Sequence, residues 1–237
     1  MNGVNEDMNE GHATSGQPPG LADWRARLAA MAAQAAGDDG AHDASHLERV
    51  WRSAEALLAH HPEADPLVVM AASYLHDLVN LPKNHPDRAQ ASRRSALLAR
   101  EQLAQRGFPY ERLDAVAHAI EAHSFSAAIA PTTIEARIVQ DADRLDALGA
   151  VGLARMFYIS GRLGRALAHP SDPLALDRTL DDGAYSLDHI MVKLARLPEM
   201  MQTAAGREMA NARLGKLLAF RKAFADEWLG NADALAD

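Results

Sequence analysis

Apolar residues recur at intervals of three and four along most of the chain, and polar residues fill the positions between them. This periodicity is typical of amphipathic helices. It predicts helices over 21–36, 45–58, 67–77, 92–105, 112–123, 133–159, 186–197 and 203–229. β-branched runs of strand length are nearly absent, and Ala and Leu dominate. Because both are strong helix formers, we expect an all-α fold.

Several helix ends carry local signals. Ser45 with Glu48 three residues later has the form of a capping box. Pro82 follows the third helix closely and disfavours helix in the residue before it. Gly149 lies inside the 133–159 pattern, where it predicts tight packing or a bend. From Gly161 to Leu187 the pattern lapses, and we expect a long excursion that is functional or mobile.

Composition places the chain among globular proteins. Apolar residues make up 48% of its 237 residues, enough for a sizeable core. We expect residues 1–20 to form a disordered tail and residues 21–237 to form a single helical domain, with the excursion near 161–187. The polar N-terminus has no apolar signal region, and no stretch is long and apolar enough to span a bilayer. We therefore expect a cytoplasmic protein without a membrane partner.

Charge and cysteine content exclude some classes of function. The formal net charge of −8 opposes broad binding to a phosphate backbone, so we expect no bulk nucleic-acid binding. A small phosphorylated substrate remains compatible, because it needs only local positive charge. The chain has no cysteine, which excludes disulfides, thiolate-ligated zinc and thiol nucleophiles.

His76 and Asp77 are adjacent near the predicted end of a helix. Neighbouring helical residues point about 100° apart, so both reach one ion if the ion lies beside the helix or the helix ends there. A lone His-Asp pair is common by chance, and a histidine at a helix C-terminus also complements the dipole. Two further candidates raise the interest of this pair: His46 opens the preceding helix, and Asp143 lies on a later one.

Three acids, at positions 141, 143 and 146, interrupt an otherwise apolar helix. Buried carboxylates are costly without a partner, and a cation would offset that cost. The alternative is a solvated face on which Arg144 pairs with its acidic neighbours. Spacing alone does not separate the two interpretations.

The order of these residues resembles a known family. His46, then His76-Asp77, then Asp143 matches the H…HD…D pattern of HD-domain metal-dependent phosphohydrolases. The strings SHLERVW, YLHDLVNLPKNHPDRAQAS, IEAHSFS and IVQDADRLDALGAVGLARMF look like a bacterial branch similar to nucleotide pyrophosphohydrolases. The resemblance covers roughly residues 25–225. It implies a helical bundle with a divalent cation at its centre, bound by His46, His76, Asp77 and Asp143, and a water that attacks phosphorus.

Imidazole and carboxylate ligands together suit Mn²⁺, Co²⁺, Ni²⁺, Fe²⁺ or Zn²⁺, whereas Mg²⁺ is less suited because it prefers oxygen-rich sites. The resemblance implies a nucleotide as partner, with hydrolysis of nucleoside triphosphates to monophosphate and pyrophosphate. Hydrolysis of nucleoside 5′-monophosphates or other phosphate esters, or metal and nucleotide binding without turnover, are the alternatives. The sequence does not predict the oligomeric state.

Further residues are candidates for catalysis or substrate binding. Lys83 and Arg88, in the loop after the His-Asp pair, and Arg144 are predicted phosphate contacts, with solvated loop charge as the alternative. We assign catalytic roles to Asp77, Lys83 and His123. For His123 these include substrate binding, proton donation or a second metal, and a histidine bonded to backbone is the alternative.

Two acids near Asp143 complete the candidates. Asp146 is predicted to contact substrate or to orient a ligand histidine, and Asp141 to orient one.

Overall fold

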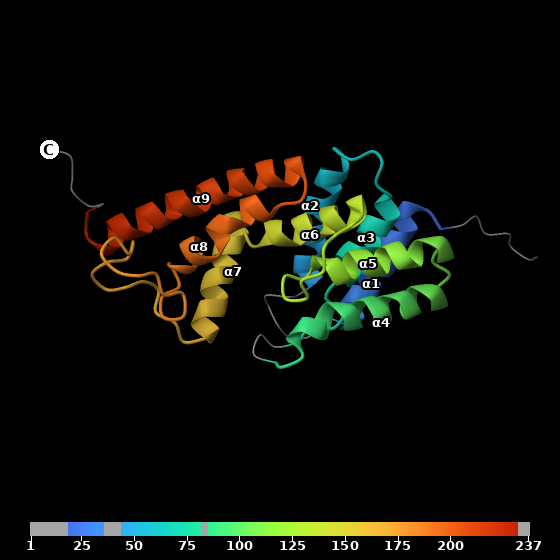
Figure 1. The fold of residues 1–237 in the computed structure, drawn as a ribbon, viewed down its shortest axis with the longest axis horizontal. Coiled ribbons are helices and arrows are strands. Elements are labelled where there is room, and N and C mark those ends of the chain that lie inside the picture. The colour runs from blue at the N-terminus through green and yellow to red at the C-terminus, as the bar shows by residue number, and fades with distance from the viewer. Residues whose placement is uncertain (1–18, 36–43, 82–84, 232–237) are drawn as a thin grey trace, which may run out of the picture.

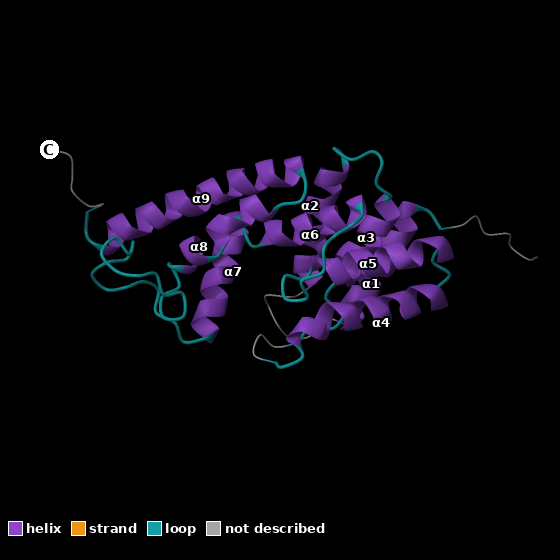
Figure 2. Cartoon of the chain, viewed as in Figure 1, coloured by secondary structure: helices purple, strands orange, loops and turns teal. Residues whose placement is uncertain are grey.

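The computed structural model describes residues 19–35, 44–81 and 85–231. Within these ranges it contains helices and one isolated bridge between Ala166 and Tyr185, and no strand (Figure 2). The α-helices are α1 (Leu21–Ala35), α2 (Ala44–Leu58), α3 (Pro66–Leu75), α4 (Ala91–Gln105), α5 (Leu113–His123), α6 (Ile134–Asp146), α7 (Gly149–Arg162), α8 (His189–Val192) and α9 (Ala204–Trp228). Short 3₁₀ segments are η1 (Arg88–Gln90), η2 (Tyr110–Arg112) and η3 (Leu194–Met200). The all-α prediction is confirmed.

The helices form two groups joined by α6. Helices α1 to α5 pack together at one end of the molecule, and α7, α8 and α9 occupy the other end (Figure 1). Helix α6 contacts α2, α3 and α5 on one side and α7 and α9 on the other. Residues at the C-terminal end of α6 can therefore touch both groups.

Helix α3 forms the centre of the first group. Its residues 67–75 are all buried, as expected for a helix that is apolar on every face. Asp65 caps its N-terminus by accepting a hydrogen bond from the Leu67 amide at 2.9 Å, and Pro66 occupies the first turn. The helix packs against α1, α2, α5 and α6. Because α3 ends at Leu75, His76 and Asp77 lie where the chain leaves the core.

The second group holds the excursion that follows α7. Asp188 is fully buried there and accepts two hydrogen bonds from Arg178, at 2.6 and 2.8 Å. It also accepts one from the Asp181 amide at 2.8 Å. The charge of Asp188 is thus compensated within the segment, and the loop is tied to the start of α8.

Three local predictions are wrong. Ser45 lies inside α2 and accepts from Arg49, while Glu48 binds Arg25 and Tyr74, so the two do not form a capping box. The helix predicted over 133–159 is two helices: α6 ends at Asp146 and α7 begins at Gly149, whose φ of +74° a continuous right-handed helix does not allow, so the bend predicted at Gly149 is confirmed. The helix predicted over 186–197 is only the short α8 followed by η3, which contains Pro198.

Two other expectations concern the ends and the surface. The predicted tail falls on residues that lie, except for 19 and 20, outside the described ranges, and the single domain over 21–237 stays a prediction. Across the described residues, no helix combines the length and apolar character needed to cross a bilayer.

Candidate metal centre

Three helices, α2, α3 and α6, bring the four predicted metal ligands together. His46 lies in the first turn of α2, and Asp143 lies near the end of α6. His76 is the C-cap residue of α3, and Asp77 follows it in a turn. Because α3 ends before both residues, the helix geometry does not hold their side chains about 100° apart. His123, the last residue of α5, completes the cluster.

The distances between these side chains are short. His46 Nε2 lies 3.9 Å from Asp77 Oδ2 and 3.5 Å from Asp143 Oδ1. His76 Nε2 lies 3.6 Å from Asp77 Oδ2 and 3.8 Å from Asp143 Oδ1. One ligand atom each from His46, His76 and Asp77 falls within 4.8 Å of the others. Sequence positions separated by about a hundred residues thus converge on one point.

The hydrogen bonds of the histidine rings determine which nitrogen faces the cluster. His76 Nδ1 donates to the Ser73 carbonyl at 2.9 Å, and His123 Nδ1 donates to the Ile120 carbonyl at 2.6 Å. His46 Nδ1 lies 2.7 Å from Asp146 Oδ2. Because carbonyls and carboxylates only accept, Nδ1 carries the proton in each ring. In the neutral rings, the Nε2 lone pairs therefore point towards Asp77 and Asp143.

This donor set fits a divalent cation. Two atoms bound to one ion at about 2.0–2.2 Å lie about 3.0–3.5 Å apart, only slightly closer than the distances here. Within the described residues, His76 Nε2 is buried and has no hydrogen-bond partner. Lone pairs that face carboxylates repel unless a positive charge lies between them, and burial of such groups without compensation is costly. Two imidazoles and two carboxylates suit a transition metal better than Mg²⁺.

The histidines of the cluster are more deeply buried than its carboxylates. The side chains of His46, His76 and His123 are at most 8% exposed, whereas those of Asp77 and Asp143 are 21% and 30% exposed. The imidazoles thus form the buried floor of the site. The carboxylates form its rim, where a substrate and water can approach.

His123 lies beside the four predicted ligands. Its Nε2 is 3.8 Å from Asp77 Oδ1, and its ring centre is 4.7 Å from that of His76. Burial lowers the pKa of His123, and the nearby His76 lowers it further, against the opposing effect of Asp143 and Asp77. The neutral ring is therefore favoured, with its lone pair directed into the site.

Asp146 lies behind His46 and not in the open part of the site. It is 3% exposed and binds the ring of His46 together with Arg49 and Arg155. Burial alone would raise its pKa, but hydrogen bonds from His46 and Arg49 and the charge of Arg155 hold the pKa well below the usual range. These contacts favour the orienting role predicted for Asp146 over contact with substrate.

Asp141, the second acid predicted to orient a ligand histidine, binds the start of α9 and not the cluster. It is fully buried and accepts from the Gln202 amide at 2.8 Å, the Thr203 amide at 2.9 Å and the Thr203 hydroxyl at 2.8 Å. Burial raises the pKa of Asp141 despite these hydrogen bonds. The prediction that Asp141 orients a ligand histidine is therefore wrong, because its carboxylate anchors the start of α9.

The predicted phosphate contacts are placed as follows. Lys83 lies outside the described residues. Arg88 donates to the Asn80 side chain at 3.0 Å and to the Leu81 carbonyl, so it braces the loop that leaves Asp77. Arg144 donates to the Met200 carbonyl and is partly buried. Both arginines thus donate hydrogen bonds to other groups of the protein in this structure.

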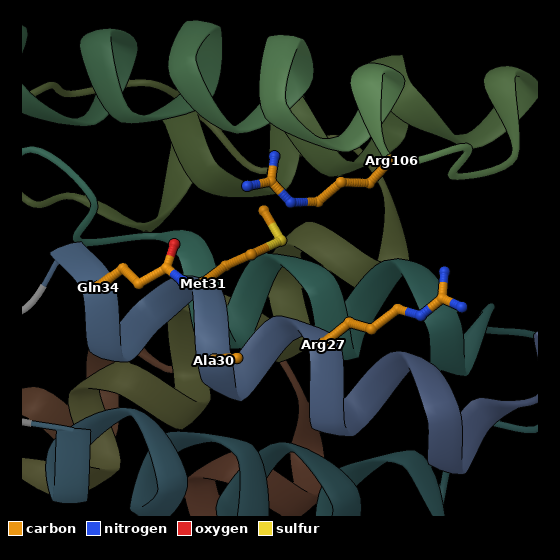
Figure 3. A pocket seen from close by; sticks show the side chains of 5 residues that line it. All are labelled: Arg27, Ala30, Met31, Gln34 and Arg106. Carbon is orange, nitrogen blue, oxygen red and sulfur yellow. The ribbon is translucent and has the colours of Figure 1, made fainter.

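A separate pocket lies away from this cluster. It has a volume of about 350 Å³ and is bordered by α1 and the C-terminal end of α4. Arg106 extends from the end of α4 over Met31 (Figure 3). The remaining lining residues are Arg27, Ala30 and Gln34. It contains no carboxylate or imidazole, so it offers no metal ligands and no general base.

Sequence reasoning missed two residues at the metal centre, Arg49 and Arg155. Arg49 follows His46 by three residues, so helical spacing places both on one side of α2 and was an available signal. Arg155 lies on α7, beyond the break at Gly149, and no local pattern distinguishes it from other helical arginines.

The chain is similar to known proteins over most of its length. A family model described as "HD domain" matches residues 43–148, which include His46, His76, Asp77 and Asp143. The protein YpgQ of Bacillus subtilis is 36% identical over 187 residues, which cover 77% of this chain and 82% of YpgQ.

Solved structures share the fold along most of its length. A crystal structure of B. subtilis YpgQ in complex with ADP superposes with a TM-score of 0.66 at 30% identity, covering 86% of this chain and 94% of that one. An HD-superfamily hydrolase from Bacillus thuringiensis gives a TM-score of 0.65 at 28% identity, covering 86% and 96%. A predicted HD-superfamily hydrolase from an uncultured Thermotogales bacterium gives 0.58 at 26% identity, covering 86% and 92%.

Proposed function

The chain belongs to the HD-domain superfamily of metal-dependent phosphohydrolases, and from this premise we propose that it hydrolyses nucleoside triphosphates to monophosphate and pyrophosphate. The observation that carries the proposal is the meeting of imidazole lone pairs and carboxylates at 3.5–3.9 Å. We propose that His46, His76, Asp77 and Asp143 hold one divalent ion there.

When bound, a divalent ion lowers the pKa of water and polarises a phosphoryl oxygen. The chain's own residues supply the rest of the chemistry. Asp77 and Asp143 keep the open side of the site negative, so a phosphate approaches only when cations compensate that charge. His123 can hold a proton at Nε2, because its Nδ1 proton is committed to the Ile120 carbonyl. We propose that it takes a proton from the attacking water.

The choice of a nucleotide rests on a relative. YpgQ, which shares the fold, was crystallised with ADP. Lys83, Arg88 and Arg144 remain the proposed phosphate contacts. Arg88 donates to the Leu81 carbonyl and so holds the loop that follows Asp77. This contact supports our proposal that Arg88 lies close enough to the site to contact phosphate.

The reaction consumes one water and cleaves the bond between the α-phosphorus and the oxygen that bridges to the β-phosphorus. Attack at the α-phosphorus releases pyrophosphate as the leaving group. Attack by the same water on a nucleoside 5′-monophosphate would instead release inorganic phosphate. Identification of the products separates the two reactions.

The test is an assay of purified protein with Mn²⁺, Co²⁺, Ni²⁺ and Mg²⁺ against ribo- and deoxyribonucleotides, with products resolved by ion-exchange chromatography. We expect equal amounts of monophosphate and pyrophosphate, complete loss of turnover with EDTA, and recovery on addition of Mn²⁺ or Co²⁺. Metal content measured before the assay shows whether the site is loaded.

Other outcomes are equally informative. Phosphate and nucleoside as the sole products would replace the pyrophosphohydrolase with a monophosphatase. Bound metal without turnover of any nucleotide would overturn the proposed substrate and favour a binding role. Turnover that survives EDTA treatment and removal of bound metal would overturn the metal mechanism itself.

A further inference from the structure

We infer that Asp146 is the positioning residue of the metal centre: it fixes the ring of His46, and Arg155 couples that arrangement to α7. The inference rests on the proposed function, since it requires His46 to be a metal ligand. It assigns Asp146 a role other than substrate contact and gives α7 a part in the metal site.

The geometry around Asp146 leaves its carboxylate little freedom. Oδ2 accepts from His46 Nδ1 at 2.7 Å, and Oδ1 accepts from Arg49 Nε at 2.7 Å. A second Arg49 nitrogen lies 3.1 Å from Oδ2, and Arg155 donates to the same oxygen. Both Asp146 and His46 are at least 97% buried. Rotation of the carboxylate would break several charge-assisted hydrogen bonds at once.

This contact has a direct consequence for His46. A carboxylate on Nδ1 excludes the tautomer with a proton on Nε2, and it makes Nε2 a stronger electron donor. Nε2 is the atom that lies 3.5 Å from Asp143 and 3.9 Å from Asp77. Asp146 therefore acts on the metal through His46, at the opposite nitrogen of the ring.

The two arginines explain how a carboxylate can be buried there. An isolated buried charge is strongly unfavourable, so it needs compensating cations. Arg49 comes from α2, the helix of His46, and Arg155 comes from α7, across the break at Gly149. Arg155 also donates to the Asp146 main-chain carbonyl at 3.4 Å. Helix α7 is thereby fastened to the end of α6 next to a metal ligand.

The test compares two buried carboxylates of the same helix. Asp146→Asn keeps size but removes the charge behind His46, and Asp141→Asn makes the same change at the anchor of α9. We expect Asp146→Asn to weaken Mn²⁺ and Co²⁺ binding, measured by calorimetry, about 10- to 100-fold. The absorption spectrum of bound Co²⁺ should also shift. Asp141→Asn should lower the melting temperature and leave the metal affinity and the Co²⁺ spectrum of the folded protein unchanged.

A measurement on the unaltered protein covers the case in which Asp146→Asn does not fold. Nitrogen-15 NMR of the Zn²⁺-loaded protein should show His46 protonated on Nδ1 and metal-bound through Nε2. A His46 protonated on Nε2 would overturn the inference. So would an Asp146→Asn variant that binds metal with unchanged affinity and spectrum.

Failure of the proposed function gives a different result. In that case the unaltered protein binds none of the metals in calorimetry, before any variant is compared. If the unaltered protein binds metal but turns over no nucleotide, the proposed reaction fails while the role of Asp146 is still measured.

Discussion

At the convergence of α2, α3, α5 and α6 the acidic side chains face imidazoles, whereas in the excursion after α7 the buried carboxylate of Asp188 faces a guanidinium. The distances differ accordingly. Asp77 and Asp143 lie 3.5–3.9 Å from histidine nitrogens, too far for hydrogen bonds. Asp188 lies 2.6 and 2.8 Å from Arg178, at hydrogen-bond distance.

The difference distinguishes a carboxylate that stabilises the fold from carboxylates that are available to bind a ligand. Asp188 has its compensating cation within the chain, so its burial needs nothing from outside. The metal centre gathers imidazole and carboxylate electron-pair donors around one point, and we propose that a bound metal supplies the positive charge there. Asp146 resembles Asp188, because arginines of the chain compensate its charge. It nevertheless acts on the metal centre, because it binds the ring of His46.

The largest expected effect is at the metal centre. Asp77→Ala removes a ligand, so we expect loss of stoichiometric metal and a fall of more than about 1000-fold in kcat/KM, as expected when charge stabilisation in the transition state is lost. Helicity by circular dichroism should be largely retained. Metal content by mass spectrometry checks the assignment.

The matched control is Asp114→Ala, which removes an exposed acid on α5 that pairs with Arg100 at the surface. Its metal content and kcat/KM should equal those of the unaltered protein. If Asp77→Ala retains full metal content, the contrast between the two regions disappears and Asp77 is not a ligand.

The next effect concerns stability without metal loss. Asp188→Ala leaves Arg178 without its buried partner, and we expect the free energy of unfolding to fall by about 3–5 kcal/mol. Denaturant unfolding measures this loss. Metal affinity of the folded variant should stay unchanged, because the compensation around Asp188 is local.

A parallel loss of metal affinity in Asp188→Ala would break the comparison. It would mean that the excursion and the metal centre are energetically coupled. The isosteric Asp188→Asn, which keeps an acceptor for the Asp181 amide, should lose less stability than the alanine variant.

The smallest effect tests the joint between the two regions. Gly149 has a φ of +74°, so Gly149→Ala should cost about 1–2 kcal/mol of stability. The new Cβ would also lie 3.4 Å from Arg213 Cγ. Thermal unfolding measures the cost.

Gly161→Ala, also in α7, is the control for Gly149→Ala. Its Cβ would meet no atom within 4 Å and its φ is not positive, so it should stabilise the helix by up to about 1 kcal/mol. Equal effects at both glycines would show that the positive φ at Gly149 costs nothing.

Helical periodicity predicted most elements well because it is a local property. Helices α1, α4, α5 and α9 begin and end within about two residues of the predicted bounds. The errors arose where tertiary contacts override local pattern. Glu48 binds Arg25 and Tyr74 instead of capping its own helix, and the 186–197 pattern forms only the short α8 before η3.

Composition and periodicity predicted the fold class from the sequence alone, and the resemblance of its motifs to HD-domain proteins indicated the family and predicted the ordered set of His46, His76-Asp77 and Asp143. The sequence did not distinguish Asp141 from Asp146, two acids on one apolar helix. The tertiary structure decided their roles, since each takes its partner from far along the chain: His46 lies 100 residues before Asp146, and Thr203 lies 62 residues after Asp141. A carboxylate's function depends on which charges surround it in space, and such neighbours exist only once the helices have packed.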